Sequence, residues 1–482
     1  MARAGVLGGL HAAAARRLLV RADHLTAVIV EPRYRDWKGE WRDVNPDTLK
    51  LVRDLVDEHP ANEAAYEIAN ASPRYARRCV VPGERRLGLA VQVYSLWSER
   101  SAGIGDLADV ASLARTSGAD FLLLSPLHAP APGFPQSASP YFPSSRQYRN
   151  PLHLRVDGLR LPNDPATPID RDAVWRAKLA ALEAEFVAFA GDPAFESYCA
   201  LEGDDLMRYA TFVDPHNVRF QQWIQWRIDE QLRAAAAAGA SLVHDIAVGF
   251  DPAGADAWMW RGQLASGWHI GAPPDEFNTA GQDWGLPPFV PDKLAAVNYR
   301  PIEAALEAAA AHGAGLRIDH VMGLFRLFWI PEGAGPADGV YVRYPATELL
   351  DVVATVSQRH GVFVVGEDLG TVEPGVREAL VARGILSYKV LSFEDDAPRA
   401  WPRLSLASAG THDLPTLAAK GEDVDAVHAR LRNANSVLVV FTAEDVLAMT
   451  DQPNRPGTDD PWNWSRRLPV PVEGLAARFA EQ

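Results

Sequence analysis

The chain has 482 residues with a formal net charge of −15; 48% of them are hydrophobic and 23% are charged, a composition that predicts a globular protein with a sizeable core. The acidic balance disfavours nucleic acid as a partner, because binding a phosphate backbone needs a surplus of Lys and Arg on one face. The two cysteines, Cys79 and Cys199, are too few for a disulfide framework and lack the spacing of a zinc site, which favours a reducing cytoplasm.

The N-terminal region is predicted to be helical. Residues 1–22 are rich in Ala and Arg and contain no acidic residue, and we interpret them as an amphipathic leading helix rather than an organellar transit peptide. A second helix is expected after Asn45, a good capping residue that precedes apolar residues at helical spacing. We therefore predict a short helical appendage over residues 1–86. No apolar run in the chain approaches the roughly 20 residues of a membrane span.

From residue 87 onward, short apolar runs alternate with Ala-rich helical segments, which is typical of βαβ units and a parallel sheet. The strand candidates are residues 89–93, 121–124, 242–244, 316–318, 362–365, 389–393, 406–409 and 437–441. Because each run is mostly apolar on both faces, the α/β fold class is predicted to be a closed (β/α)₈ barrel spanning residues 87–482. The long gaps at about 125–240 and 250–300 are predicted to be insertions at the C-terminal face, where barrel enzymes place their chemistry.

Three of the later strands are followed by an acid, namely Asp319, Glu367 and Asp413. The C-terminal ends of all strands in a parallel barrel lie on one face, so these acids should converge on one pocket. Any one of them could instead be a helix N-cap or the partner of an Arg. Together they match the cleavage of a glycosidic bond with retention, which needs one attacking carboxylate and one carboxylic acid roughly 5–5.5 Å away. No pair of ligands has the helical spacing of zincins, so we predict neither a catalytic metal nor a cofactor.

The segments around these acids resemble the family 77 glycoside hydrolases, the amylomaltases or disproportionating 4-α-glucanotransferases. The matching segments, in the order of the family, are Ser139-Pro140-Tyr141, Gly271-Ala272-Pro273-Pro274-Asp275, Gly281-Gln282-Asp283-Trp284-Gly285, Leu316-Arg317-Ile318-Asp319-His320, Gly366-Glu367-Asp368-Leu369-Gly370 and Thr411-His412-Asp413-Leu414-Pro415-Thr416. The resemblance implies a retaining double displacement. It would transfer segments of an α-1,4-glucan donor to a glucose or maltooligosaccharide acceptor.

The resemblance also implies roles for individual residues. Asp319 would be the nucleophile, Glu367 the general acid and base, and Asp413 the acid that stabilises the transition state. Arg317 should lie on the same side of its strand as Asp319, where its cation can hold that carboxylate ionised. Glu367 can act as an acid at neutral pH only if its pKa is raised above about 4.3, by nearby carboxylates and partial burial.

Further residues would contact the sugar if the resemblance holds. They are Tyr141, Asp245, Phe277, Gln282, Trp284, Phe393, His412 and Asn454. Structural alternatives exist for three of them: Tyr141 as a packed loop residue, Phe393 as a core residue and Asn454 as a turn cap. Phe277 follows Glu276, where several relatives carry two aromatic residues, which puts acceptor handling in question.

Two other functions remain open from the sequence alone. An α-glucan hydrolase would use the same carboxylates, and the altered Glu276 position together with the short segment between Asp413 and Val437 suggests this alternative. A non-catalytic glycan-binding barrel is the second alternative. The intact set of three acids argues against it.

Overall fold

The computed structural model describes residues 29–56, 77–275 and 278–482. Its centre is a closed barrel of eight parallel strands, each paired with the next along the chain and the last paired with the first. The strands are β3 (Arg86–Val91), β4 (Phe121–Leu124), β7 (Ser241–Ile246), β10 (Gly315–Ile318), β13 (Phe363–Gly366), β14 (Leu386–Val390), β15 (Ser405–Ser408) and β16 (Leu438–Thr442). The predicted (β/α)₈ barrel is confirmed, and every predicted strand overlaps one of these eight.

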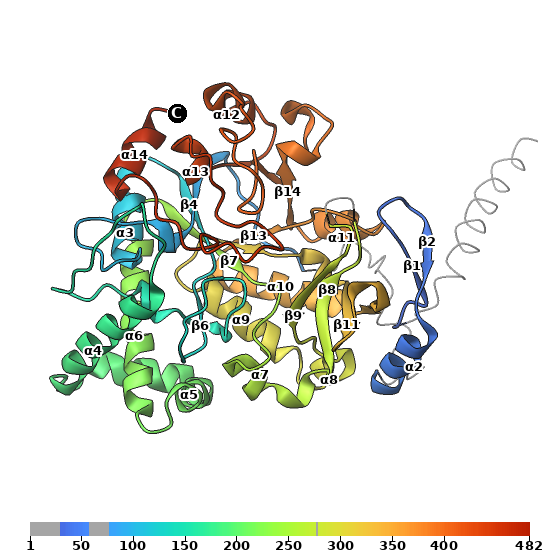
Figure 1. Cartoon of the computed structure of the whole chain (residues 1–482), viewed down its shortest axis with the longest axis horizontal. Coiled ribbons are helices and arrows are strands. Elements are labelled where there is room, and N and C mark those ends of the chain that lie inside the picture. Colours follow the sequence, from blue (N-terminus) through green and yellow to red (C-terminus); the bar gives the residue numbers. More distant parts are fainter. Residues whose placement is uncertain (1–28, 57–76, 276–277) are drawn as a thin grey trace, which may run out of the picture.

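Helices surround the barrel (Figure 1). They are α3 (Leu107–Thr116), α6 (Val218–Ala236), α9 (Arg300–Ala310), α10 (Ala346–His360), α11 (Val376–Ala382), α12 (Val424–Arg432), α13 (Ala443–Val446) and α14 (Val472–Ala480). None of the helices in the described ranges is long and apolar enough to cross a membrane.

The connection from β14 to β15 departs from the alternating pattern. It contains two short 3-10 helices, η7 (Leu391–Phe393) and η8 (Pro398–Ala400). The strand predicted at 389–393 is therefore wrong in its second half, since β14 ends at Val390 and Phe393 lies in η7. Leu391 and Phe393 continue the apolar alternation after the chain has left the sheet, and a local pattern cannot register that change.

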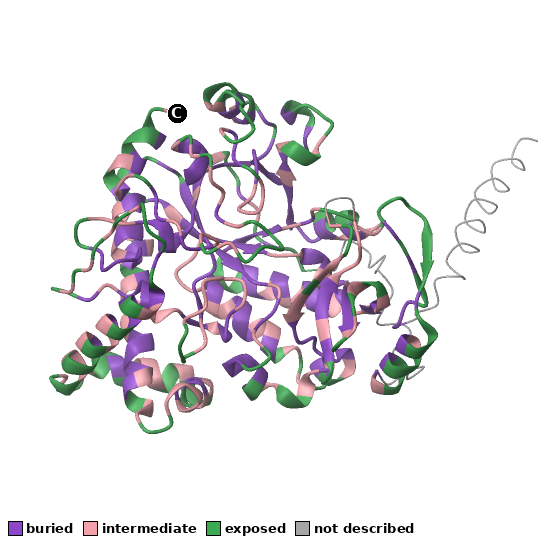
Figure 2. Ribbon diagram, viewed as in Figure 1, coloured by how far each residue is buried: buried purple, intermediate pink, exposed green. Residues whose placement is uncertain are grey.

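The inside of the barrel is a packed apolar core. It contains Phe121, Leu123, Val243, Phe363, Val365, Leu386, Tyr388, Val390, Leu406, Leu438 and Val440. Figure 2 shows buried residues concentrated on the barrel strands and on the helix faces turned toward them. Because side chains alternate along a strand, the inward-facing positions continue upward from Val243 to Asp245 and from Val365 to Glu367. Polar side chains therefore form the layer above the apolar core.

The two predicted insertions contain additional elements. The first contains β5 (His128–Ala129), β6 (Ser145–Arg149), η3 (Pro151–His153), α4 (Arg171–Val187) and α5 (Pro193–Val213), and the second contains α7 (Ala255–Met259), η4 (Arg261–Gln263), β8 (Trp268–Ala272), β9 (Gln282–Leu286) and α8 (Pro291–Ala296). β8 and β9 join β11 (Arg326–Pro331) and β12 (Val340–Arg343) in a four-stranded sheet beside the barrel (Figure 1). This sheet is not among the elements predicted from the sequence.

The described N-terminal residues pack on the edge of that sheet. The helix expected after Asn45 is α2 (Pro46–Leu55), and the Asn45 side chain accepts a hydrogen bond from the Asp47 N–H at 2.9 Å. Two short strands, β1 (Arg33–Arg35) and β2 (Trp41–Asp43), precede it, so this part of the predicted appendage is not all helical. Val30 bridges to Val342 of β12. The predicted leading helix at 1–22 lies outside the described residues, and the domain boundary after residue 86 stays a prediction.

Close packing between neighbouring strands gives a first testable prediction. Gly88 of β3 lies opposite Phe121 of β4, and a Cβ atom at Gly88 would lie 2.4 Å from the Phe121 ring. Gly88→Ala should therefore lower the free energy of unfolding by about 1–3 kcal/mol, the usual range for overpacking. Thermal unfolding measures the effect, and the exposed Gly83→Ala, which meets no atom within 4 Å, is the control. Equal melting temperatures for the two variants would contradict the prediction.

Candidate active site

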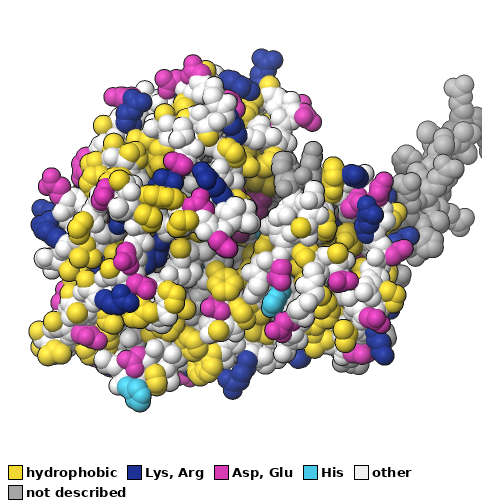
Figure 3. All heavy atoms as spheres, viewed as in Figure 1, with side chains coloured by type: hydrophobic (Ala, Val, Ile, Leu, Met, Phe, Trp, Pro, Cys, Tyr) yellow, Lys and Arg dark blue, Asp and Glu magenta, His cyan; other side chains and the backbone are white. Residues whose placement is uncertain are grey.

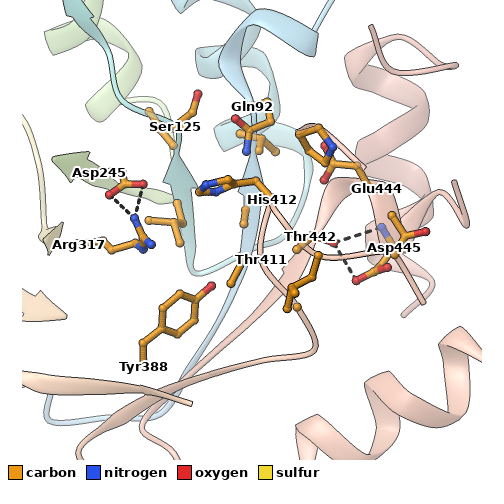
Figure 4. Close-up of a pocket in the computed structure, with 18 of the residues that line it drawn as sticks. Gln92, Ser125, Asp245, Arg317, Tyr388, Thr411, His412, Thr442, Glu444 and Asp445 are labelled. Carbon is orange, nitrogen blue, oxygen red and sulfur yellow. Dashed lines mark hydrogen bonds and ion pairs between the residues drawn. The ribbon is translucent and has the colours of Figure 1, made fainter. Parts of the chain in front are cut away.

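The predicted acids lie at the C-terminal face of the barrel, each close to the end of a different strand. Asp245 belongs to β7, Asp319 follows β10, Glu367 follows β13, and Asp413 comes after β15. Figure 4 shows a pocket on this face, with Asp245, Arg317 and His412 among the residues that line it. The pocket encloses about 630 Å³, including space open to solvent.

Arg317 joins two of the carboxylates. Its Nη1 atom lies 2.7 Å from both oxygens of Asp245, and its Nη2 atom lies 3.0 Å from Oδ1 of Asp319. The pairing of β7 with β10 places Arg317 opposite Asp245, so the sheet itself sets this contact. Burial disfavours the charge on Arg317, but the two carboxylates outweigh it and raise the pKa of the guanidinium further. Arg317 therefore stays a cation inside the pocket.

Glu367 has a different environment. Its carboxyl group accepts hydrogen bonds from the backbone N–H of His320 at 2.8 Å and of Leu369 at 2.9 Å. His320 has a left-handed backbone, with φ of 44°, a conformation that few non-glycine residues adopt. Burial, and then the charge of Asp319, raise the pKa of Glu367 to about 7.

The proton of this carboxyl pair belongs on Glu367. Burial raises the pKa of Asp319 as well, but the Arg317 cation opposes that effect. Of the two acids, Asp319 is the one that contacts Arg317. The arrangement thus favours a carboxylate at Asp319 beside a carboxylic acid at Glu367.

A chain of hydrogen bonds continues from Asp245 across the pocket. The Tyr141 hydroxyl donates to Oδ2 of Asp245 at 2.6 Å and lies 3.3 Å from Nδ1 of His412. His412 Nε2 lies 3.4 Å from Oδ2 of Asp413, whose Oδ1 accepts from the Asn454 amide at 2.6 Å. Burial opposes both charges, but each member of the His412–Asp413 pair stabilises the other, which raises the pKa of His412 and lowers that of Asp413.

Tyr141, His412 and Trp464 form an aromatic cluster beside the pocket. The rings of Tyr141 and His412 are stacked with centroids 4.8 Å apart, and Trp464 lies 5.4 Å from Tyr141 and 5.1 Å from His412. Such faces complement the apolar C–H face of a pyranose ring. Trp464 is not among the predicted sugar contacts.

The remaining predicted contacts lie elsewhere around the site. Gln282 and Trp284 are on β9, where the Trp284 indole N–H donates to the Gln282 side chain at 3.0 Å. The Trp284 ring packs edge-on against His320 at 5.2 Å, which connects β9 to the segment that follows Asp319. Phe393 is 41% exposed in η7, and Phe277 lies outside the described residues. Sugar binding by these residues stays a prediction.

The sequence interpretation missed several residues that line the pocket: Gln92, Tyr388, Thr411, Glu444 and Asp445. Glu444 comes shortly after an apolar strand, as the three predicted acids do, so the same reasoning applied to β16 could have found it. Asp368, by contrast, is buried and accepts hydrogen bonds from the Ser387 hydroxyl and the Tyr388 N–H, which explains it as a structural residue. Within residues 29–56, 77–275 and 278–482, no three His, Cys, Asp or Glu residues form a cluster suited to a metal ion.

Comparison with known proteins identifies relatives of the whole described barrel. The family described as 4-alpha-glucanotransferase, glycoside hydrolase family 77, matches residues 91–216 and 213–420. A 4-alpha-glucanotransferase of Mycobacterium tuberculosis is 41% identical over 79% of this chain, and one of Haemophilus influenzae is 33% identical over 70%. The chain spans 64% and 60% of the length of these two relatives. The crystal structure of amylomaltase from Corynebacterium glutamicum superimposes with a TM-score of 0.83 at 26% identity, covering 97% of this chain and 99% of that one.

The raised pKa of Glu367 predicts a pH-dependent cost in stability. The ordinary pKa of the group is 4.5 and the folded value is about 7, so the folded state loses stability as the pH rises between these values. Glu367→Gln cannot ionise, and it should gain up to about 3 kcal/mol relative to the natural protein at pH 8, at about 1.4 kcal/mol per pKa unit. Thermal unfolding at pH 4 and pH 8 checks this.

The exposed Glu422→Gln serves as the control for this measurement. It should show no gain that grows with pH. If Glu367→Gln shifts the melting temperature equally at both pH values, the folded state does not hold a proton on Glu367 and the assignment is wrong.

Proposed function

The chain belongs to glycoside hydrolase family 77, the 4-alpha-glucanotransferases, and from this membership we propose that it transfers α-1,4-glucan segments between glucan molecules by a retaining double displacement. One observation carries the proposal. Arg317 contacts Asp319, while burial and the charge of Asp319 raise the pKa of the neighbouring Glu367 to about 7. A nucleophilic carboxylate and a proton donor therefore lie close enough to interact at the C-terminal face of the barrel.

In the first step, the Asp319 carboxylate attacks the anomeric carbon of the donor glucan. The C1–O4 bond breaks as Glu367 gives its proton to the leaving oxygen, and the donor segment becomes an ester on Asp319. The charge that develops on the ring in the transition state is positive. Asp413, held by His412 and Asn454, is the carboxylate assigned to stabilise it.

In the second step, Glu367 acts as a base because it has lost its proton. It takes the proton of the 4-hydroxyl group of an acceptor glucose or maltooligosaccharide, and that oxygen attacks C1 and releases Asp319. Water in place of the sugar would give hydrolysis. The Trp284 ring, which is bonded to Gln282, packs against His320, the residue directly after Asp319. This position near the nucleophile favours β9 as part of the acceptor side.

The surface and the cysteines fit a cytoplasmic enzyme that acts on a neutral polymer. On the face shown in Figure 3, Lys and Arg side chains lie singly among acidic ones and form no continuous basic patch. Cys79 and Cys199 are free thiols. These features support a neutral glucan, rather than nucleic acid or a membrane, as the partner.

Incubation with maltotriose tests the proposed function. Transfer should yield glucose together with a ladder of maltooligosaccharides longer than the substrate, separated by chromatography. Shortening without elongation would indicate a hydrolase instead, and no turnover would leave a glycan-binding barrel. Asp319→Asn should lower the transfer rate by at least about 10³-fold, because the nucleophile of the covalent step is lost.

Asp459→Asn makes the same chemical change at an exposed position, and it should transfer at the rate of the natural protein. If Asp319→Asn retained the ladder at a comparable rate, the covalent mechanism would be excluded. Both proteins are first compared by thermal unfolding, so that a folding defect is not read as a chemical one.

The pKa of Glu367 also predicts the pH dependence of the reaction. The first step needs the protonated acid, so kcat/KM for maltotriose should fall as the pH rises above about 7. α-Maltosyl fluoride is the matched control, because fluoride leaves without a proton and its release should not show the same alkaline limb. A kcat/KM for maltotriose that stays constant from pH 6 to pH 9 would contradict the assignment of Glu367.

A further inference from the structure

Gln92 and Glu444 are polar side chains of the pocket that lie outside the hydrogen-bond chain from Arg317 to Asn454. Gln92, directly after β3, is 9% exposed, and its Oε1 atom has no hydrogen-bond partner among the described residues. Glu444, in the first turn of α13, is 6% exposed. Its carboxyl group accepts a bond from its own backbone N–H, and no Lys or Arg contacts it in the described part of the chain. Both residues line the pocket.

The strand register explains why the two side chains are together. β16 pairs with β3 so that Thr442 lies opposite Ala90, and Glu444 and Gln92 each come two residues later. They therefore leave the barrel at the same level. Figure 4 shows both on the side of His412 away from Arg317. The pocket thus has polar groups at two opposite sides: those near Arg317 are paired with one another, whereas the Gln92 Oε1 atom has no partner among the described residues.

The neighbouring residue Asp445 has a structural role, and its hydrogen bonds provide a comparison for Glu444. Its Oδ1 atom accepts from the Leu417 N–H at 2.8 Å and its Oδ2 atom from the Thr442 hydroxyl at 2.9 Å, bonds that fix the turn after β16. Glu444 makes no comparable bond within the described residues. Burial raises the pKa of Glu444 to about 7, and the bond from its own backbone N–H offsets this effect only in part. A structural role therefore does not explain why a carboxyl group is buried at position 444.

A buried amide oxygen and a buried carboxyl group both require hydrogen-bond donors, which an occupant of the pocket must bring. A cation is an unsuitable occupant, because Arg317 already carries a positive charge in this pocket and Asp413 favours one on His412. Sugar hydroxyl groups are neutral donors of the right kind. We propose that Gln92 and Glu444 form a further donor-side binding pair that accepts hydrogen bonds from hydroxyl groups of the glucan held on Asp319.

This inference rests on the proposed glucan transfer and adds to it a determinant of donor specificity. The ring of the donor would be held between the Gln92–Glu444 pair on one side and the Arg317 network on the other. A site built to bond a hydroxyl group rejects an analogue without it, because its own polar groups then stay unpaired. The pair should therefore select donors that carry the full set of hydroxyl groups and fix the ring against Asp319.

The test uses α-maltosyl fluoride and a panel of its analogues, each lacking one hydroxyl group, with glucose as acceptor. Fluoride release gives kcat/KM for the natural protein and for Glu444→Leu. The variant should lose about 10- to 100-fold on the parent donor, the range of a buried bond to a charged group. At least one analogue should lower kcat/KM of the natural protein by a similar factor relative to the parent donor. For Glu444→Leu, that analogue and the parent donor should have the same kcat/KM.

Glu84→Leu is the matched control, because it makes the same change at an exposed glutamate before β3, at the opposite end of the barrel. Glu444→Gln keeps an acceptor oxygen and should recover most of the lost discrimination. If Glu444→Leu does not fold, Gln92→Leu and Glu444→Gln are measured on the same panel, and a missing hydroxyl group should again cost one of them less than it costs the natural protein.

The inference is overturned if every analogue is disfavoured as strongly by the variants as by the natural protein, since Glu444 and Gln92 would then not contact the donor. It is also overturned if Glu444→Leu and Gln92→Leu leave kcat/KM for the parent donor unchanged. The proposed function fails in a different way. In that case the natural protein itself neither releases fluoride nor forms maltotriose from glucose.

Discussion

The buried guanidinium of Arg317 is the group on which the site depends. A cation in this position is costly unless it is paired, and Asp245 and Asp319 supply that pairing at 2.7 Å and 3.0 Å. The dependence is mutual. Without Arg317, two carboxylates would share the top of the barrel with no cation between them, and their repulsion would favour protonation of both. A protonated Asp319 could not attack a sugar.

The same cation separates the tasks of otherwise similar acids. Four carboxyl groups, of Asp245, Asp319, Glu367 and Asp413, lie at the C-terminal face of the barrel, at or after the ends of four of its strands, and their chemistry differs because their partners differ. Asp319 contacts Arg317, Asp413 contacts His412 and Asn454, and Glu367 receives two backbone N–H groups. Backbone dipoles favour the ionised form less than a full charge does, so the proton stays with Glu367. A single cation, placed by strand register, thus distinguishes nucleophile from acid.

Much of this could be predicted from the sequence, for a physical reason. Barrel strands are buried on both faces and read as continuous apolar runs, so all eight were located, and the acids that follow them converge because parallel strands end on one face. The pairing of Arg317 with Asp245 was not predicted, because it depends on which residues of β7 and β10 lie side by side. The β8–β9–β11–β12 sheet was also missed. Strands such as Gln282–Leu286 contain glycine and polar residues, and only tertiary contacts make them strands.

The barrel has an apolar layer inside and a polar layer at the C-terminal ends of its strands, and this arrangement explains how a stable protein can contain such a site. Below the strand ends, aromatic and aliphatic side chains such as Phe121 and Phe363 fill the interior, and their burial stabilises the fold. The polar layer above them includes two acids, Glu367 and Glu444, whose pKa burial raises from 4.5 to about 7, and each costs stability increasingly as the pH rises between these values. Glu367 receives two backbone N–H groups, whereas Glu444 receives only its own, so Glu444 has more capacity left to accept bonds from a ligand. The polar groups of this layer that stay unpaired therefore mark where the substrate completes the structure.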